Sequence, residues 1–486
     1  MGSDKNPDIE CLASLDGSLE ATRPKFMNAR QSLDEHPPLS SFENLWKAQR
    51  KGWIMSLHIV IAGGGFSGLA AARSLRHADL MVTLIDTRNY FLFQPLLYQV
   101  ASGDLHAEAV ATPIRQVLRG RNQRFRLGTI IGFDFERNRV VMDDETDIPY
   151  DRLIVSLGSA TKFPESKNLA KNAWHLKGIP EAENLRSRIL LSLERASVCS
   201  DLKEREIWLT FAIVGGGSTG VEFACGLLEL LHVLVPRDYP EIDLGKVTVC
   251  ILHGGDSLLP DFPPSLRSYA RKRVESLGGT VRFHTHVMDY DGLKISLSSG
   301  ETVLARTLVW AAGVSAPLLA SSLPGEKDPA GRILVNDRLQ IPGHPEIYVL
   351  GDMARTKDGV SPQVAPFAIQ TGQYAAQMVL SSINLSLVPP PFVYRNPGNM
   401  VVLGRYDAIC YFPWKSFMCR GLGAWVLWLG LHLAKILGPR NRLLALVDWG
   451  QDYLFRSATM EIIRSFQTSD IAQGSGSGKK CAKDPE

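Results

Sequence analysis

Two glycine-rich fingerprints of the same form occur in this chain, and no other feature constrains its fold as strongly. In the first, the apolar run His58–Ala62 leads into Gly63–Gly68, with the sequence Gly-Gly-Gly-Phe-Ser-Gly. In the second, the apolar run Leu209–Val214 leads into Gly215–Gly220, with the sequence Gly-Gly-Gly-Ser-Thr-Gly. A buried strand, a tight turn and a helix start in this order are typical of the phosphate-binding turn of a Rossmann-like unit.

Each glycine of such a turn has its own task. The first makes the tight turn, the third lets a pyrophosphate approach the bare backbone, and the sixth allows the helix to pack close on the strand. The helix N-terminus then offers unpaired N–H groups and a partial positive charge to the phosphates. Two motifs therefore predict two dinucleotides, and the simplest pair is a flavin with a nicotinamide nucleotide. The predicted contacts are Gly63, Gly65, Phe66, Ser67 and Gly68 in the first site, and Gly215, Gly217 and Gly220 in the second.

The residue after the second strand of each unit should set how the adenosine ribose is held. In the first unit the strand Met81–Ile85 is followed by Asp86 and Thr87, where a carboxylate commonly binds ribose hydroxyls. In the second unit the strand Lys246–Leu252 is followed by His253. A carboxylate repels a 2′-phosphate, so its replacement by histidine admits NADPH beside NADH. A protonated imidazole would attract the phosphate, which predicts an NADPH preference that rises as pH falls from about 8 to about 6.

Composition removes several other classes of protein. The chain has 486 residues, which is enough for two or three domains, and its formal net charge of +3 gives no reason to expect nucleic-acid binding. Its seven cysteines are scattered and form no CxxC, so no metal site is predicted. The helix after Gly68 also lacks the close cysteine pair of flavin disulfide reductases, which excludes that class.

The order of the predicted strands suggests that the second nucleotide domain is inserted into the first. Short antiparallel strands are predicted over residues 125–155, and buried strands return at Leu308–Gly313 and Glu346–Leu350. The predicted fold is α/β, with two Rossmann-like domains and a C-terminal amphipathic region. The predicted boundaries are 56–175 with 306–388 for FAD binding, 176–305 for NAD(P)H binding, 389–470 for membrane binding, and 1–55 and 471–486 for a disordered polar extension and a flexible tail.

The C-terminal region has an unusual charge pattern. Residues 408–447 contain no Asp or Glu but five Lys or Arg. Within them, residues 422–438 form an apolar helix that carries Trp425 and Trp428 and is marginal in length for spanning a bilayer. A helix lying in the membrane interface fits better, with tryptophans at headgroup depth and basic residues near anionic lipid. We therefore expect residues 415–455 to bind a bilayer surface; the alternative is a buried core helix or a dimer interface.

Five segments together resemble the type II NAD(P)H:quinone oxidoreductases. They are Arg88–Ala101, Val309–Val314, Tyr348–Asp352, Ala365–Gly372 and Arg440–Leu444. Members of that family are single-chain FAD enzymes on the membrane surface, which oxidise NADH or NADPH and reduce a quinone without pumping protons. The resemblance implies FAD, a membrane quinone and a homodimer. It also implies a peripheral location on the cytoplasmic face of the cell membrane or on an internal energy-transducing membrane.

The resemblance also implies roles for individual residues. The first fingerprint and Asp86 would hold the adenosine half of FAD, and the second would hold the nicotinamide nucleotide. Glu222 matches a family carboxylate near the flavin and nicotinamide, although an acid in a first helical turn is also favoured by the helix dipole. Gln370 matches a glutamine of the quinone site, although it would also suit a helix surface, and Pro366 and Thr371 stand where many members have Gln. The remaining expected cofactor contacts are Gly158, Gly313, Gly351 and Asp352.

Two other functions remain open from the sequence. One is a flavin reductase that serves another electron carrier, such as an iron–sulfur protein, or that oxidises sulfide. The sulfide reaction needs cysteines near the flavin, and a ferredoxin-type partner does not explain the aromatic, basic C-terminal region. The second is a membrane-bound flavoprotein that senses nucleotide redox state and turns over slowly. The histidine at position 253 and the altered glutamine motif leave this second function open.

Overall fold

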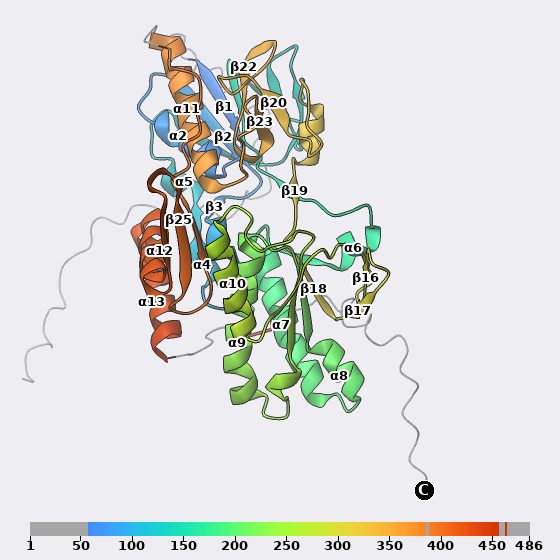
Figure 1. Ribbon diagram of the computed structural model, residues 1–486. Helices are drawn as coiled ribbons and strands as arrows, with labels where there is room; N and C mark the ends of the chain where they lie inside the picture. Colours follow the sequence, from blue (N-terminus) through green and yellow to red (C-terminus); the bar gives the residue numbers. More distant parts are fainter. Residues whose placement is uncertain (1–56, 385–387, 456–461, 464–486) are drawn as a thin grey trace, which may run out of the picture. The chain divides into compact units, whose positions relative to one another are not determined.

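The computed structural model describes residues 57–384, 388–455 and 462–463. The predicted extension over residues 1–55 and the predicted tail over 471–486 lie outside them. Two sheets of mainly parallel strands form the body of the described chain, and helices pack against them (Figure 1). The predicted α/β class with two Rossmann-like sheets is confirmed.

The first fingerprint belongs to a six-stranded sheet with the order β21-β22-β9-β1-β2-β5. Neighbouring strands are parallel except for β21 with β22. Ile59, Val60 and Ile61 have no exposed surface, because the sheet is covered on both faces, and this explains the continuous apolar run in the sequence. The strands are β1 (His58–Ala62), β2 (Met81–Asp86), β5 (Gln123–Leu127), β9 (Arg152–Val155), β21 (Gln340–Ile341) and β22 (His344–Val349).

The second fingerprint belongs to a five-stranded parallel sheet with the order β11-β18-β12-β13-β14. All of its strands fall between β9 and β21 in the chain, so the second unit is inserted into the first. The boundaries predicted at residues 175 and 306 are wrong for two strands, because β11 and β18 pair in this sheet and not in the first. The strands are β11 (Trp174–His175), β12 (Thr210–Val214), β13 (Thr248–Leu252), β14 (Thr280–Arg282) and β18 (Thr307–Trp310).

The described chain also contains smaller sheets beside the two large ones. Of the strands predicted as antiparallel over 125–155, the middle ones form the sheet β6-β7-β8, while β5 and β9 at either end belong to the large parallel sheet. The short strands are β3 (Tyr90–Leu92), β4 (Ala111–Pro113), β6 (Ile130–Asp134), β7 (Arg139–Met142), β8 (Asp147–Pro149), β10 (Ala160–Thr161), β15 (Val287–Tyr290), β16 (Lys294–Leu297), β17 (Thr302–Leu304), β19 (Val314–Ser315), β20 (Ile333–Val335) and β23 (Ala354–Thr356).

Helices bring the functional segments together. The helix of the first glycine turn, α2, packs against α11, and α3 packs against both α7 and α9. Among the described helices, α9 is long and apolar enough to cross a membrane, but 67% of its apolar window is buried, as in a core helix. The helices are α2 (Phe66–Ser74), α3 (Leu97–Ser102), α4 (Ala107–Val110), α5 (Ile114–Val117), α6 (Lys167–Asn172), α7 (Ile179–Val198), α8 (Leu202–Trp208), α9 (Ser218–Asp238), α10 (Pro264–Ser276) and α11 (Ala365–Asn384).

The C-terminal region has its own small sheet and two helices, drawn in orange to red in Figure 1. Strands β24 (Asn399–Val402), β25 (Ala408–Phe412) and β26 (Phe417–Arg420) are antiparallel. Helix α12 (Leu422–Lys435) packs on β25 and on α13 (Pro439–Phe455). Because α12 has 14 residues, it is shorter than a membrane-spanning helix needs to be.

Candidate cofactor and catalytic sites

The first glycine turn lines a cavity of about 350 Å³, a size typical of small-molecule sites. A Cβ atom at Gly63 would strike the Ser156 carbonyl group, and one at Gly68 would overlap the Gly63 carbonyl oxygen. At Gly65, by contrast, no protein atom lies within 4 Å of where a Cβ atom would stand. Open, bare backbone beside a helix N-terminus is what a pyrophosphate needs, so these residues fit a bound dinucleotide.

The cavity collects predicted residues from distant parts of the chain. Gly68, Gly313 and Gly351 do not line it. Gly351 instead has a positive φ of +62° and donates its N–H to the Thr371 hydroxyl at 3.1 Å, so it shapes the backbone. The predicted residues that do line the cavity are Gly63, Gly65, Phe66, Ser67, Asp86, Thr87, Gly158 and Asp352.

Asp86 holds the glycine turn as well as lining the cavity. One oxygen, Oδ2, accepts a hydrogen bond from the Gly64 amide at 2.7 Å. The other, Oδ1, accepts one from the Arg88 amide at 2.8 Å. The carboxylate at the end of β2 is therefore fixed in position beside the open backbone, where it can accept from a ribose hydroxyl.

Three hydrogen-bonded side chains that the sequence did not reveal as a group lie in the lining of the same cavity. The Lys177 ammonium donates to the Ser159 hydroxyl at 2.9 Å, and this hydroxyl donates to Asp352 Oδ2 at 2.7 Å. Burial lowers the pKa of Lys177, and the nearby Asp352 carboxylate opposes that shift. Ser159 follows the predicted Gly158 directly, which was a usable signal, whereas no motif marks Lys177.

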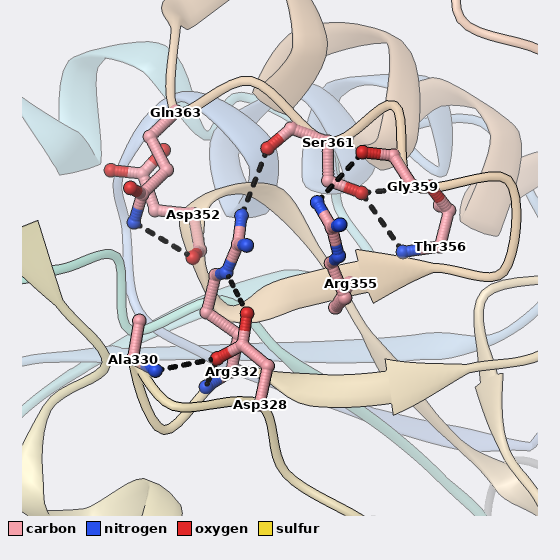
Figure 2. Close-up of polar contacts among 9 residues, drawn as sticks. All are labelled: Asp328, Ala330, Arg332, Asp352, Arg355, Thr356, Gly359, Ser361 and Gln363. Atoms are coloured by element: carbon pink, nitrogen blue, oxygen red, sulfur yellow. Dashed lines mark hydrogen bonds and ion pairs between the residues drawn. The ribbon is translucent and has the colours of Figure 1, made fainter.

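The segment around Asp352 is fixed by a network of side chains, shown in Figure 2. Gln363 donates from Nε2 to the Asp352 carbonyl oxygen at 3.3 Å. Arg332 pairs with Asp328 at 2.7 Å and donates to the Ser361 carbonyl oxygen at 3.0 Å. These contacts tie the loop after β23 both to Asp352 and to the start of β20.

The second glycine turn repeats the geometry of the first. Gly215 has a φ of +117°, and a Cβ atom there would stand 2.8 Å from the Ala311 carbonyl oxygen. A Cβ atom at Gly220 would overlap the Gly215 carbonyl oxygen, while none would meet an atom within 4 Å at Gly217. The residues of this turn therefore fit a second dinucleotide.

His253 occupies the place that Asp86 has in the first unit. Its Nδ1 accepts a hydrogen bond from the Gly216 amide at 3.1 Å. Burial lowers the pKa of His253 below its usual value near 6.5, against weaker contributions from Ser257 and Asp256 that raise it. Burial therefore shifts protonation of the imidazole toward more acidic pH, which weakens the gain of charge expected between about pH 8 and about pH 6.

Glu222 lies away from the first cavity's lining and faces a second, much smaller one. Its side chain is buried, and its Oε1 accepts a hydrogen bond from the Val402 amide of β24 at 3.3 Å. Burial raises the pKa of Glu222 to about 8, and the Val402 contact opposes this only in part. Glu222 is the fifth residue of α9, whose first turn holds no acid, so the expected alternative of a first-turn acid does not apply.

Gln370 is engaged in the fold. Its Nε2 donates to the Arg395 carbonyl oxygen at 2.8 Å, and its Oε1 accepts from the Arg395 amide at 3.1 Å. Both polar atoms of the side-chain amide are hydrogen-bonded to the backbone of Arg395, and Gln370 lines neither of the two described cavities. In the described structure it ties α11 to the segment that leads into β24.

The C-terminal helices present an apolar surface, although not through the tryptophans that were expected there. Trp425 and Trp428 are 8% and 0% exposed, so their predicted place at headgroup depth is wrong. Trp428 stacks on His432 at 4.3 Å between ring centres, and Trp425 meets the Tyr453 ring edge-on. The C-terminal apolar surface consists of the exposed side chains Trp414, Phe417, Leu422, Val426, Leu427, Leu431, Leu443, Leu446, Val447 and Leu454.

Known proteins share both the sequence and the fold of this chain. The model of the family described as pyridine nucleotide-disulphide oxidoreductase matches residues 57–372. The type II NADH:quinone oxidoreductase NdhA of Mycobacterium tuberculosis is 37% identical over 423 residues, which are 84% of this chain and 89% of that protein. Ndh of the same organism, also named a type II NADH:quinone oxidoreductase, is 36% identical over 412 residues, which are 82% of this chain and 88% of Ndh.

Solved structures agree with these relatives. NDH2 from Plasmodium falciparum in complex with NADH superimposes with a TM-score of 0.77 and covers 84% of this chain and 100% of its own. At 20% identity this likeness shows a shared fold and nothing about function. The two glycine turns, the inserted second sheet and the long matches at 36–37% identity lead to one conclusion: this chain belongs to the type II NADH:quinone oxidoreductases, within the pyridine nucleotide-disulphide oxidoreductase family.

Proposed function

We propose that this chain is an FAD enzyme of the membrane surface that takes a hydride from NADH or NADPH and passes two electrons to a membrane quinone, without pumping protons. The observation that carries the proposal is the presence of two open glycine turns, at Gly65 and Gly217, in one member of this family. One turn suits a resident flavin nucleotide and the other an exchanging nicotinamide nucleotide.

The side chains of the first cavity would hold and tune FAD. When bound, FAD would take up a hydride and then give up two electrons. Gly65 and the N-terminus of α2 would receive the pyrophosphate, and Asp86 would accept from the adenosine ribose. The chain from Lys177 through Ser159 to Asp352 would place positive charge and oriented donors along the rest of the cofactor.

His253 supports the use of both nicotinamide nucleotides. It satisfies the Gly216 amide as a carboxylate would, but it brings no negative charge to repel a 2′-phosphate. Because its pKa lies below the usual value, it brings no positive charge to attract the phosphate at neutral pH either. We therefore infer weak discrimination between NADH and NADPH that does not change with pH near neutrality.

The C-terminal apolar surface supports a place on a membrane. It combines exposed aliphatic side chains of α12 and α13 with exposed basic residues, among them Lys415, Lys435 and Arg440. This combination suits the headgroup region of an anionic bilayer, from which a quinone would enter. The location would be the cytoplasmic face of the cell membrane or an internal energy-transducing membrane, and a homodimer there would present two such surfaces.

Steady-state kinetics of the purified, FAD-loaded protein test this function. NADH and NADPH are each supplied with a quinone and, separately, with ferricyanide, which accepts electrons without protons. We expect turnover with both nucleotides and with quinone. Turnover with ferricyanide but none with quinone would favour a reductase for another carrier. Slow turnover with every acceptor would favour the redox sensor.

A further inference from the structure

The second cavity collects buried ionisable side chains that the proposed reaction has not yet used. It has a volume of about 20 Å³, enough for about one water molecule, and lies where α3 and α9 meet the C-terminal region. Helix α9 contributes Glu222 and Glu229, and the loop after α3 contributes Asp104. The C-terminal region contributes Arg405 and Asp452.

The carboxyl groups around this cavity outnumber the positive charges. Arg405 forms an ion pair with Asp452, and its backbone amide donates to Glu229 Oε1 at 2.6 Å. Arg273 stands 3.8 Å from the same Glu229 oxygen. Asp104 receives only a neutral donor, the Ser102 hydroxyl at 2.7 Å, and Glu222 only the Val402 amide. The other ionisable groups close to the cluster are Cys225, Asp407 and Tyr453.

Burial keeps protons on these groups near neutral pH. It raises the pKa of Asp104 and of Glu222 to about 8 each, and the pKa of Glu229 to about 7. The carboxyl groups can therefore both bind and release a proton under ordinary conditions, which exposed carboxylates cannot do.

Tyr98 adds a buried hydroxyl to this cavity. Its side chain is 4% exposed, and its hydroxyl has no hydrogen-bond partner among the described residues. Tyr98 lines the cavity, and its pKa is raised first by burial and then by the nearby Glu222 carboxyl group. A buried hydroxyl needs a partner, and the cavity has room and polar neighbours for one water molecule.

The proposed reaction needs one proton from solvent in each turnover. NAD(P)H gives up a hydride, that is, one proton and two electrons, while the quinone takes up two electrons and two protons to become a quinol. The balanced reaction is NAD(P)H + H⁺ + quinone → NAD(P)⁺ + quinol. Because Glu222 is buried, a proton that it gives up must be replaced through the protein.

We propose that Glu229, Asp104 and Tyr98, with one water molecule in the second cavity, form the path that carries this proton from solvent to Glu222. The path rests on the proposed function. Glu229 is its outer end, because its side chain is 18% exposed. Glu222 is its inner end, and Tyr98 and the water link the buried carboxyl groups between them. These residues position and hold the proton, and Glu222 delivers it.

The variants Tyr98→Phe, Asp104→Asn and Glu229→Gln test the path, with Glu206→Gln as the matched control. Glu206 is exposed, pairs with Lys246 and is not among the residues that line the cavity. We expect each path variant to slow quinone turnover about tenfold above pH 7 and to increase its solvent deuterium isotope effect. Ferricyanide turnover, which consumes no proton, should remain within about twofold of wild type, as should both activities of Glu206→Gln.

Infrared spectroscopy gives a readout that does not depend on turnover. In wild-type protein, the absorption of protonated carboxyl groups should titrate with a component near pH 8. Asp104→Asn should lose part of this component, and Tyr98→Phe should shift it without loss of folding, since it removes one hydroxyl only. Unchanged infrared titrations, or quinone turnover at wild-type rates and isotope effects in Tyr98→Phe, would overturn the path. Wild-type protein that reduces ferricyanide but no quinone would instead overturn the proposed function.

Discussion

The Nδ1 atom of His253 accepts a hydrogen bond from the backbone amide of Gly216 at 3.1 Å. In the first unit, the same contact is made by Asp86 Oδ2 and the Gly64 amide at 2.7 Å. Both units thus use the residue after their second strand to hold the glycine turn. In the second unit an imidazole ring replaces the carboxylate, so the turn is kept without a carboxylate that would repel a 2′-phosphate.

Replacing His253 with Asp should restore selection for NADH. An Asp side chain can accept from Gly216 in the same way, but its charge repels a 2′-phosphate. We expect kcat/KM with NADPH to fall about tenfold relative to NADH, a difference of about 1.4 kcal/mol. His253→Asn, which accepts without a charge, is the control and should keep the wild-type ratio. The kcat/KM values for both nucleotides check this.

The wild-type nucleotide preference should not change with pH near neutrality. Burial lowers the pKa of His253 below its usual value, so the imidazole is mainly neutral from about pH 7 to about pH 8 and its charge changes little over that range. The check is the NADPH to NADH ratio of kcat/KM at several pH values in that range. A ratio that rises on acidification with a midpoint near 6.5, and does not do so in His253→Asn, would contradict the neutral ring.

Alanine at Gly217 and at Gly220 should have opposite consequences. The space beside Gly217 is open and its φ is −78°, so Gly217→Ala should fold within about 0.5 kcal/mol of wild type. Its methyl group would occupy the approach of the pyrophosphate, so nucleotide binding should weaken at least about tenfold. Gly220→Ala would drive a methyl group into the Gly215 carbonyl and should destabilise the fold. Thermal unfolding and nucleotide titration separate the two effects.

The sequence predicted the two nucleotide units because their signals are local. Gly63 and Gly215 need a positive φ, and Gly68 and Gly220 leave no room for a side chain, so glycine is required in each place. The domain boundaries were less accurate. Strand β18 looks like any buried strand, and only its pairing with β12 assigns it to the second sheet.

Other features depend on contacts that no pattern announces. Lys177 reaches the first cavity through the fold, and Tyr98 shares the second cavity with Glu222 only because α3 packs on α9. The aromatic residues Trp425 and Trp428 look interfacial in sequence, yet they pack inward, because β25 and α13 cover their side of α12. Composition predicts that helix α12 is apolar, but it does not predict which side of the helix is covered by other elements.

Removing the charge of Lys177 should make bound FAD harder to reduce. Its ammonium lies in the cavity lining and is held by Ser159, so it favours the more negative, reduced form of the cofactor. We expect Lys177→Gln to lower the two-electron potential of bound FAD by about 30 mV, equivalent to about 1.4 kcal/mol. Lys177→Arg should keep most of the wild-type potential. Spectroelectrochemical titration measures both, and equal potentials in Lys177→Gln and wild type would remove this role.

Glu222 should make the stability of the fold depend on pH. Its pKa is about 8 when the protein is folded and near the ordinary value of 4.5 when it is unfolded. The folded state therefore binds more protons between these values, so its contribution to stability is present below about pH 4.5 and is lost as pH rises through 8. Glu222→Gln cannot ionise, so we expect it to raise Tm by roughly 3 °C at pH 8 and to leave it unchanged at pH 5. The same variant should slow turnover while FAD stays bound.

Polar substitution of the C-terminal apolar surface should separate membrane binding from folding. Leu443 and Val426 are 62% and 56% exposed, so Leu443→Asp and Val426→Asp should leave Tm within about 2 °C of wild type. Each should weaken binding to anionic vesicles and lower turnover with a long-tailed quinone, because the acceptor arrives through the bilayer.

Trp428 provides the contrasting case. It has no exposed surface and stacks on His432, so Trp428→Ala should cost about 3–5 kcal/mol of folding stability. Its activity with ferricyanide and with quinone should therefore fall together, in proportion to the folded fraction. Vesicle sedimentation, thermal unfolding and the two assays on all three variants check this pattern. If Leu443→Asp also lost both activities equally, the surface would be a folding element, because a membrane-binding role predicts loss with the quinone alone.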